Sequence, residues 1–168
     1  MLDLDETLIH YDKETGKLKR RPHLKYFLYD VSKSWNIMVF TASVQKYADT
    51  ILDLIDPTNI IQKRLYRDQC TKIDQNYYKD LAQINKDLSW IVIVDNYSTS
   101  FELQKDNGIE IRGWYDDNNE DRELIKLSVA LETLVRLKDV REGVRKMNSS
   151  LDQFKIDSER EPPKSNSP

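Results

Sequence analysis

The sequence predicts an α/β domain with a doubly wound, mostly parallel sheet. Two short segments, 35–40 and 90–94, are apolar almost throughout, which is typical of strands covered on both faces. Segments with apolar residues at helical spacing precede, separate and follow them. Because strands that alternate with helices form right-handed βαβ units, we expect helices on both faces of a parallel sheet.

Length and composition favour one globular domain. The chain has 168 residues, of which 39% are hydrophobic and 33% charged, and its net charge is −3. This charge argues against a generally cationic surface that binds nucleic acid. The single cysteine, Cys70, excludes an internal disulfide and a multi-cysteine zinc site. No apolar run approaches the roughly 20 residues of a membrane span, and the first residues do not resemble a signal peptide. We therefore expect an intracellular protein, in the nucleus or cytoplasm, although an anchor upstream of this sequence stays open.

Four strands are expected in the sheet. The segments 35–40 and 90–94 are the clearest, whereas 109–111 is weaker because apolar and polar residues alternate in it. Residues 2–4 would form the end of a fourth strand. Strands usually need about five residues, so this one is expected to be truncated.

Helices are expected wherever apolar residues repeat every three or four positions. Pro22 suits the first turn of a helix that continues to Val31. Ser43 is expected to cap the next helix, which ends at Pro57. Two further helices are expected over 78–87 and 121–138.

The remaining segments are expected to be irregular. Residues 11–18 suit a short hairpin or loop around Gly16. Residues 148–168 are polar and rich in Pro and Ser, so we expect a disordered tail after a domain that spans residues 1–147.

Asp3 and Asp5 form the first candidate site. Residues i and i+2 of an extended chain point to the same side, and ligands of open α/β sheets bind at the carboxyl ends of the strands. Two adjacent carboxylates repel each other unless a cation lies between them, and Mg²⁺ prefers such oxygen ligands. A carboxylate beside Mg²⁺ can also attack a phosphoryl group. An isolated pair of this kind is nevertheless more often a solvated or capping feature.

Polar groups also follow the two clear strands. Thr41 comes directly after the first, and Asp95 and Asn96 come directly after the second. Lys79 lies between them, at the start of a predicted helix. Each group alone is typical of an N-cap, a turn or a solvated surface. Together they supply the hydroxyl, the ammonium group and the metal-binding oxygens that a phosphoryl-transfer site requires.

The order of these groups resembles that of the four motifs of the haloacid dehalogenase-like phosphatases. The segments LDLDETLIH, VFTAS, KYAD, YYKDL and IVIVDN are similar to those of the small phosphatases related to the enzymes that act on the C-terminal domain of RNA polymerase II, the NLI-interacting-factor-like group. The resemblance covers about residues 1–140. It implies a haloacid dehalogenase-like fold and a Mg²⁺-dependent protein serine/threonine phosphatase with an aspartyl-phosphate intermediate.

The resemblance also implies a role for each matching residue. Asp3 would be the phosphorylated nucleophile, and Asp5 would be the general acid and base, with a backbone carbonyl that binds Mg²⁺. Thr41 and Lys79 would stabilise the phosphoryl group. The residues implied in substrate binding are Thr7, Arg67 and Tyr47, and those implied in metal binding are Asp3, Asp5, Asn96 and Asp95. Tyr47 also fits the buried stripe of its helix, so a core position is an equal alternative.

The spacing of the motifs leaves no room for a cap domain. A hairpin, a helix and a strand use nearly all of residues 8–40, and a helix, a strand and loops fill residues 42–78. A site without a cap cannot enclose a small metabolite, which favours a phosphorylated side chain of a protein. Two alternatives stay open, namely a catalytically weak phosphoprotein-binding module and a small-molecule phosphatase. The oligomeric state is not predicted.

Basic residues gather before the first predicted helix. Such a cluster attracts acidic or multiply phosphorylated peptides if it lies near the site, but a solvated face is the simpler interpretation. The acidic residues at 116–123 are expected to favour the N-terminus of the last helix. The basic cluster comprises Lys13, Lys17, Lys19, Arg20, Arg21 and Lys25.

Overall fold

A parallel sheet forms the centre of the protein. The computed structural model describes residues 1–116 and 118–159, with side chains up to residue 149. Strand β3 (Met38–Phe40) pairs with β4 (Lys63–Leu65), and β7 (Ile93–Asp95) pairs with β8 (Gly108–Glu110), both in parallel. Leu2 forms parallel bridges to both β3 and β7, so the first residues of the chain join the two pairs. The expected fourth strand is therefore present as this central bridge.

Backbone hydrogen bonds fix the position of Asp3 at the end of this central segment. The amide of Leu2 donates to the carbonyl of Met38 at 2.8 Å, and its carbonyl accepts from Phe40 at 2.9 Å. On the other side, the amide of Asp3 donates to the carbonyl of Val94 at 2.9 Å. Because all the strands run in the same direction, Asp3 emerges at the carboxyl edge between the ends of β3 and β7.

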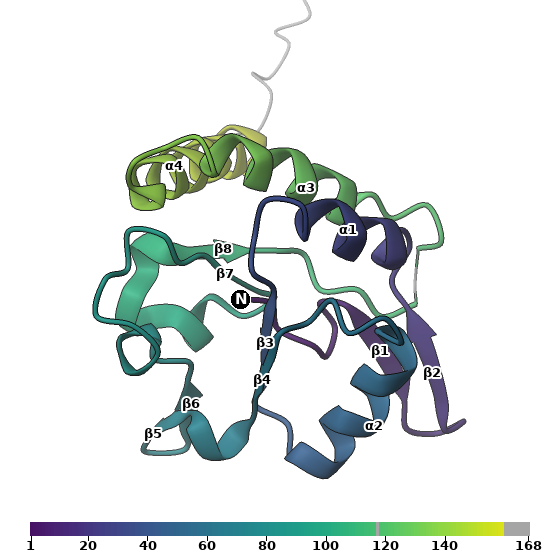
Figure 1. The fold of residues 1–168 in the computed structure, drawn as a ribbon. Helices are drawn as coiled ribbons and strands as arrows, with labels where there is room; N and C mark the ends of the chain where they lie inside the picture. Colours follow the sequence, from purple (N-terminus) through teal and green to yellow (C-terminus); the bar gives the residue numbers. More distant parts are fainter. Residues whose placement is uncertain (117, 160–168) are drawn as a thin grey trace, which may run out of the picture.

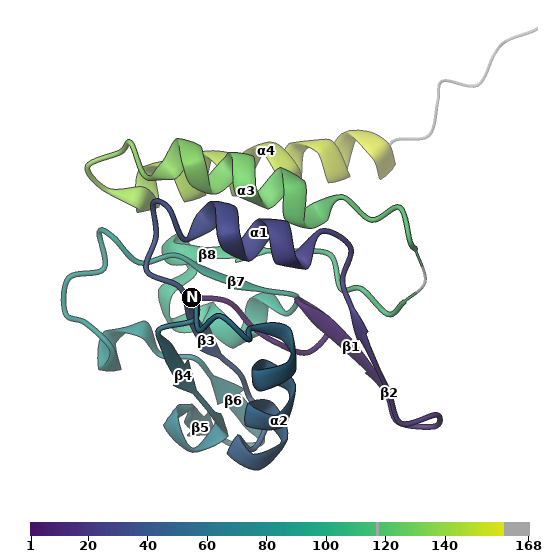
Figure 2. The same ribbon diagram turned by 45° about the vertical axis from the view of Figure 1, so that its right-hand side comes forward.

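Helices cover both faces of the sheet, as predicted. Helices α1 (Leu24–Val31), α3 (Glu123–Leu134) and α4 (Val140–Glu159) lie together on one side, whereas α2 (Gln45–Ile55) lies on the other (Figures 1 and 2). In each of the three helices that were predicted and are present, the core-facing residues are buried. The buried residues of α1 are Leu24, Phe27, Leu28 and Val31, those of α2 are Ala48, Ile51, Leu52 and Ile55, and those of α3 are Leu124, Leu127, Leu131 and Leu134. The prediction of a doubly wound fold is confirmed.

A hairpin extends from the sheet before α1. Strands β1 (Ile9–Asp12) and β2 (Lys17–Arg20) pair antiparallel, with Asp12 opposite Lys17. Gly16 adopts a positive φ of 67° in the turn, a conformation that costs glycine little. The prediction of a hairpin around this glycine is confirmed, and no cap domain interrupts the described segments 8–40 and 42–78.

The prediction of a helix over 78–87 is wrong. This part of the chain instead contains the hairpin β5 (Thr71–Ile73) and β6 (Asn76–Tyr78), followed by a single 3₁₀ turn, η2 (Leu81–Gln83). Only two apolar residues of the predicted helix fit a helical stripe, which is too little buried surface to stabilise an α-helix. Lys79 therefore extends from the end of a strand. Two further 3₁₀ segments, η1 (Arg67–Gln69) and η3 (Ser98–Asn107), were not predicted.

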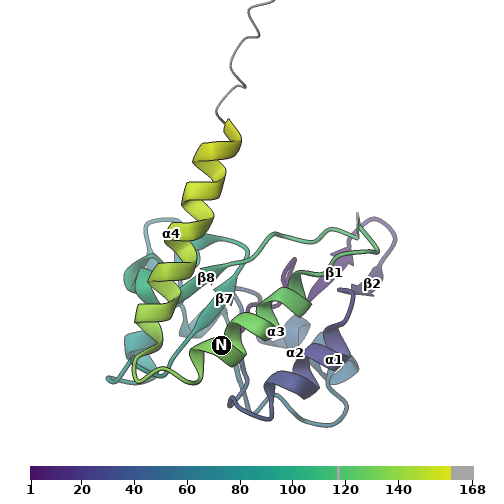
Figure 3. The same cartoon turned by 90° about the horizontal axis from the view of Figure 1, so that it is seen from above.

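Helix α4 occupies part of the chain that was expected to be a tail. It continues through residues 148–159 and extends away from the body of the protein (Figure 3), while residues 160–168 lie outside the described residues. Its first turns are anchored by Val140 and Val144, both fully buried. No helix in the described part of the chain has the length and apolar character that a membrane crossing requires.

A buried ion pair joins the hairpin side of the molecule to the segment before α3. The guanidinium of Arg21 donates to both carboxylate oxygens of Asp121 at 2.9 Å. The same group donates to the backbone carbonyls of Thr7 at 3.1 Å and Arg112 at 2.8 Å. Burial alone would raise the pKa of Asp121, but Arg21 outweighs it and lowers that pKa below its ordinary value. Arg21 therefore belongs to the core, and the predicted basic cluster is not one solvated patch.

Removal of this guanidinium should destabilise the fold. We expect Arg21→Ala to lower the free energy of unfolding by about 3–5 kcal/mol, because Asp121 would remain buried without a partner. Urea unfolding followed by circular dichroism measures this loss. Lys25→Ala, which removes an exposed charge from α1, serves as the control and should change stability by less than about 0.5 kcal/mol. Equal stability of Arg21→Ala and Lys25→Ala would contradict the stabilising role of the buried Arg21–Asp121 pair.

Candidate active site

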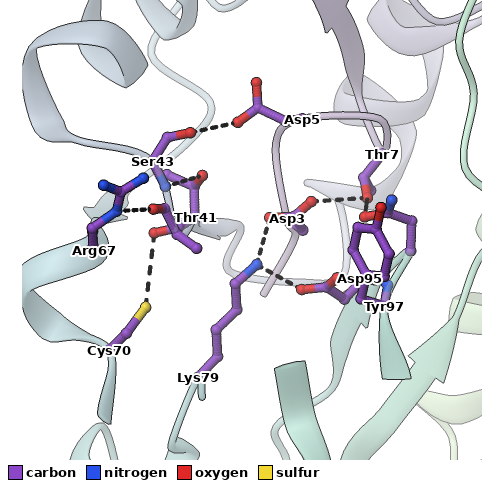
Figure 4. A network of polar contacts seen from close by, with 12 residues as sticks. Asp3, Asp5, Thr7, Thr41, Ser43, Arg67, Cys70, Lys79, Asp95 and Tyr97 are labelled. Carbon is purple, nitrogen blue, oxygen red and sulfur yellow. Dashed lines mark hydrogen bonds and ion pairs between the residues drawn. The ribbon is translucent and has the colours of Figure 1, made fainter. Parts of the chain in front are cut away.

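A cleft opens at the carboxyl edge of the sheet. It has a volume of about 560 Å³ and brings together residues from the ends of three strands, the N-terminal hairpin and the start of α2. Figure 4 shows how the polar side chains converge on it. Among the residues that line the cleft are Asp3, Asp5, Thr41, Tyr47, Arg67, Lys79, Asp95 and Asn96. Thr7 does not line the cleft, but its hydroxyl bonds to Asp3, which does.

Lys79 occupies the centre of the buried charge network. Its ammonium group contacts the carboxylate of Asp3 and lies 2.6 Å from Asp95 Oδ2. All three side chains are at least nine-tenths buried. Burial alone would lower the pKa of Lys79, but the two carboxylates outweigh it and raise that pKa. Burial raises the pKa of Asp3, and the charge of Lys79 opposes this increase. Lys79 is thus a permanent cation that permits two carboxylates to lie close together.

Thr7 connects Asp3 to Asn96. The Thr7 hydroxyl donates to Asp3 Oδ2 at 3.1 Å and lies 3.4 Å from Asn96 Oδ1. The Asn96 oxygen thus faces the hydroxyl that also holds Asp3. Glu6, next to Thr7 in this turn, adopts a positive φ of 61°. Asp3 and Asn96 therefore present oxygens to the same hydroxyl, although they are far apart in the sequence.

Two hydroxyl groups hold the Asp5 carboxylate. Ser43 Oγ donates to Asp5 Oδ2 at 2.8 Å, and the Tyr47 phenol donates to Oδ1 at 2.5 Å. Burial and the neighbouring Asp5 raise the pKa of Tyr47, so the phenol keeps its proton and remains a donor. Tyr47 lines the cleft and also packs against the core cluster beside the buried stripe of α2, so it combines both predicted positions. The prediction that Ser43 caps α2 is wrong, because the N-cap position is Val44 and Ser43 contacts Asp5 instead.

Thr41 and Arg67 line the α2 side of the cleft. Thr41 is buried at the end of β3, and its hydroxyl oxygen accepts from the amide of Ser43 at 3.0 Å, which leaves the hydroxyl proton available. Arg67 Nε donates to the carbonyl of Ala42 at 2.6 Å, and its guanidinium lies over the ring of Tyr77 at 5.4 Å. These contacts hold one edge of the guanidinium and direct the group toward the cleft.

The oxygen atoms of the cleft suit a hard cation. No group of three or more His, Cys, Asp or Glu side chains converges as a metal cage in the described residues. The available donors are instead the Asp3 carboxylate, the Asn96 amide oxygen and backbone carbonyls. Asp95 accepts from Lys79 with one oxygen and from the amide of Tyr97 at 2.9 Å with the other, so both of its oxygens already have partners. This small set of oxygen ligands, completed by water, is typical of Mg²⁺ sites.

The sequence matches a known phosphatase family over most of its length. Residues 1–141 match the NLI interacting factor-like phosphatase family. The chain belongs to this family. It is 41% identical over 174 residues to CTD small phosphatase-like protein 2 of Dictyostelium discoideum, covering 93% of this chain and 30% of that protein. It is also 41% identical to CTD small phosphatase-like protein 3 of Caenorhabditis elegans, covering 86% of this chain and 57% of that protein.

Solved structures support the same fold. The chain resembles the fission yeast RNA polymerase II CTD phosphatase Fcp1 bound to beryllium fluoride with a TM-score of 0.57 and 20% identity, covering 91% of this chain and 55% of the other. A second Fcp1 structure gives a TM-score of 0.58, covering 96% and 54%. The fold expected from the family resemblance is confirmed. The chain spans between about a third and just over half of the length of the two relatives named above.

The cleft also contains residues that the motifs did not identify. Ser43, Tyr11 and Tyr97 line it, and Tyr11 packs edge-on against Tyr47 with ring centroids 5.8 Å apart. Ser43 follows Thr41 by two residues, so its hydroxyl was a visible signal that we interpreted as a helix cap. Tyr11 and Tyr97 carried no such signal, because only the hairpin and the turn after β7 bring them to the rim.

Loss of Lys79 should destabilise the protein in a pH-dependent manner. We expect Lys79→Met to cost about 3–5 kcal/mol at about pH 7.5, because Asp3 and Asp95 would be buried without a cation. The cost should be smaller at about pH 5. At that pH the buried carboxyls of the folded variant would hold protons, whereas the same carboxyls in the unfolded chain, with pKa values of about 4, would have released them.

Urea unfolding in EDTA at the two pH values measures both effects. Lys86→Met removes an exposed lysine in a loop and serves as the matched control. If Lys79→Met lost the same free energy of unfolding at both pH values, the pairing of Lys79 with Asp3 and Asp95 would be contradicted.

Proposed function

We propose that this chain is a Mg²⁺-dependent protein serine/threonine phosphatase that acts through an aspartyl-phosphate on Asp3. The observation that supports this most directly is the convergence of Asp3, Asp5, Thr41 and Lys79 on one open cleft. Membership of the phosphatase family supports the same chemistry. A binding module without catalysis would not need two differently held carboxylates.

Asp3 is suited to nucleophilic attack. Lys79 contacts one of its oxygens and Thr7 the other, so the carboxylate is oriented before a substrate binds. In the first step one Asp3 oxygen forms a bond to phosphorus while the bond from phosphorus to the serine or threonine oxygen breaks. Lys79, Arg67 and the Thr41 hydroxyl stabilise charge on the phosphoryl oxygens.

Asp5 is suited to proton transfer at the leaving oxygen. Its carboxyl group gives a proton to the serine or threonine oxygen in the first step. In the second step it accepts a proton from water, whose oxygen attacks phosphorus and releases phosphate, so that free Asp3 is restored. Ser43 and Tyr47 would act as positioning residues, because their hydroxyls hold this carboxyl group from two sides.

The proposed metal site would combine Asp3, Asn96 and the backbone carbonyl of Asp5, while Asp95 holds Lys79. Mg²⁺ bound there would offset repulsion between the Asp3 carboxylate and the phosphoryl group. The orientation of the Asn96 oxygen toward the Asp3 network supports this assignment.

Phosphorylated proteins are the proposed substrates. No cap domain covers the cleft in the described segments between the motifs, so a side chain presented by another protein can enter. The names of the relatives, CTD small phosphatase-like proteins, support this substrate class. We propose an intracellular location, in the nucleus or cytoplasm, and one relative is named nuclear envelope morphology protein 1.

Substitution of the nucleophile tests the mechanism. We expect Asp3→Asn to lower kcat on a phosphoserine peptide and on an aryl phosphate by about 1000-fold or more, because the amide cannot form the phosphorylated intermediate. Asp74→Asn changes an exposed turn residue with a positive φ of 54°, which asparagine also tolerates, and should retain activity. Turnover by Asp3→Asn at the wild-type rate would overturn the mechanism.

Metal removal tests the cofactor. EDTA should abolish turnover, and added Mg²⁺ should restore it. Asn96→Ala should raise the Mg²⁺ concentration for half-maximal activity by about 10- to 100-fold. Isothermal titration of Mg²⁺ into the folded wild type and variant gives a second readout. Unchanged activity in EDTA would contradict Mg²⁺ dependence.

A further inference from the structure

The predicted basic cluster separates into groups with different partners. Arg21 is buried against Asp121, and Lys19 pairs with Asp116 at 2.9 Å. Arg20 donates to the carbonyl of Leu54 at 2.8 Å. Lys13 is the member of the cluster that lines the cleft. The sequence cluster therefore contributes a cation to the site at one position.

The turn of the β1–β2 hairpin presents Lys13 without neutralising it. The carboxylate of the preceding Asp12 accepts from the amides of Glu14 at 2.9 Å and Thr15 at 3.2 Å, and also from the Thr15 hydroxyl. These bonds hold the acid within its own turn and lower its pKa. Glu14 is exposed and does not line the cleft. Lys13 is thus carried by a turn that the Asp12 carboxylate organises through its own hydrogen bonds.

A second lysine lies on the same side of the site. Lys46, in the first turn of α2, lines a hollow that adjoins the cleft and shares Tyr11, Val44 and Tyr47 with it. The edge-on contact between Tyr11 and Tyr47 joins the hairpin to α2, and both rings line the cleft and the adjoining hollow. Neither ammonium group has a hydrogen-bond or ion-pair partner among the residues that the structure describes.

The acidic groups near these lysines are already engaged. Glu6 lines the cleft and interacts electrostatically with Lys13, but its carboxylate lies 2.7 Å from His10 Nδ1. Asp5 is held by two hydroxyl groups. On the opposite side of the cleft, Tyr97 and Ser100 are uncharged. The hairpin and α2 side of the rim therefore carries the exposed lysines Lys13 and Lys46, whereas Arg67 lines the cleft from η1.

We propose that Lys13 and Lys46 form a binding site for a second anion of the substrate, a carboxylate or a second phosphate on the same peptide as the scissile phosphate. This inference rests on the proposed function and names its preferred substrates. Because the two cations lie on one side, the second anion should be favoured on one side of the phosphorylated residue and not on the other. Exposed charge pairs of this kind change binding by about 3- to 5-fold.

Matched phosphoserine peptides test this proposal. One peptide carries alanines around the phosphoserine, and others carry aspartates, or a second phosphoserine, on the N-terminal or the C-terminal side. We expect an anion on one side to raise kcat/KM about 3- to 5-fold over the alanine peptide. Comparison of the aspartate and diphosphorylated peptides identifies which anion the rim prefers.

Variants at the rim assign the effect to the two lysines. Lys13→Gln and Lys46→Gln, alone and combined, should reduce the ratio between charged and neutral peptides toward one, and Lys13→Glu should invert it. Lys25→Gln removes the same charge from α1, outside the cleft, and should leave the ratio unchanged. A double variant that retains the wild-type ratio would overturn the proposal, as would an equal loss in Lys25→Gln.

Binding measurements separate this proposal from the phosphatase assignment. Fluorescence anisotropy of the same peptides on Asp3→Asn reports affinity without turnover. Charge-dependent binding that disappears in Lys13→Gln/Lys46→Gln would support the anion site at the rim, whether or not the wild type hydrolyses any peptide. A wild type that hydrolyses no peptide would overturn the proposed phosphatase function alone. Equal affinity for all peptides would overturn the rim.

Discussion

The carboxyl edge of the sheet depends on one ammonium group between two buried carboxylates. Asp3 and Asp95 end neighbouring strands, and without a cation their repulsion and desolvation would disfavour the folded state. Lys79 removes this conflict from a third direction, with its backbone amide bonded to the carbonyl of Ser100 at 2.7 Å. The same cation that permits the fold is therefore available to a phosphoryl group, so stability and proposed chemistry share one contact.

A second network fixes the loop that carries the acids. Arg21 binds the carbonyl of Thr7, and the amide of Trp114 donates to the carbonyl of Glu6 at 2.8 Å. The loop after the central strand is thus attached both to the hairpin side and to the segment before α3. Phosphoryl transfer depends mainly on positioning and charge stabilisation, so groups that are fixed before the substrate arrives contribute most to the rate.

Charge is distributed differently inside the cleft and at its rim. Each buried cation, Arg21 and Lys79, has carboxylate partners at hydrogen-bonding distance. At the rim, Lys13 and Lys46 are exposed and have no such partner among the described residues. A buried charge must be compensated within the protein, whereas water can solvate an exposed one until a substrate replaces that water. This difference separates the groups that hold the fold from those suited to selecting a ligand.

Local sequence predicted the strands because apolar runs have few alternatives to burial. It predicted a strand within residues 42–78 but did not locate β4, whose residues Lys63 and Arg64 are polar and therefore give no apolar signal. Lys79 lines the cleft, but it follows a strand and not the predicted helix, since two apolar residues nearby fit a helix without requiring one. Ser43 satisfied a local capping rule, but its actual acceptor is Asp5, which lies far away in the sequence.

The sequence by itself determined that Asp3, Thr41 and Asp95 meet at the cleft, because parallel strands bring the residues at their carboxyl ends to one edge. Only the tertiary structure decided the partner of each group. Arg21 illustrates the reason, since in the sequence it belongs to a basic cluster and in the folded chain it is buried against Asp121, 100 residues later. Periodicity reports burial along a segment, whereas the pairing of charges depends on which distant segments fold together.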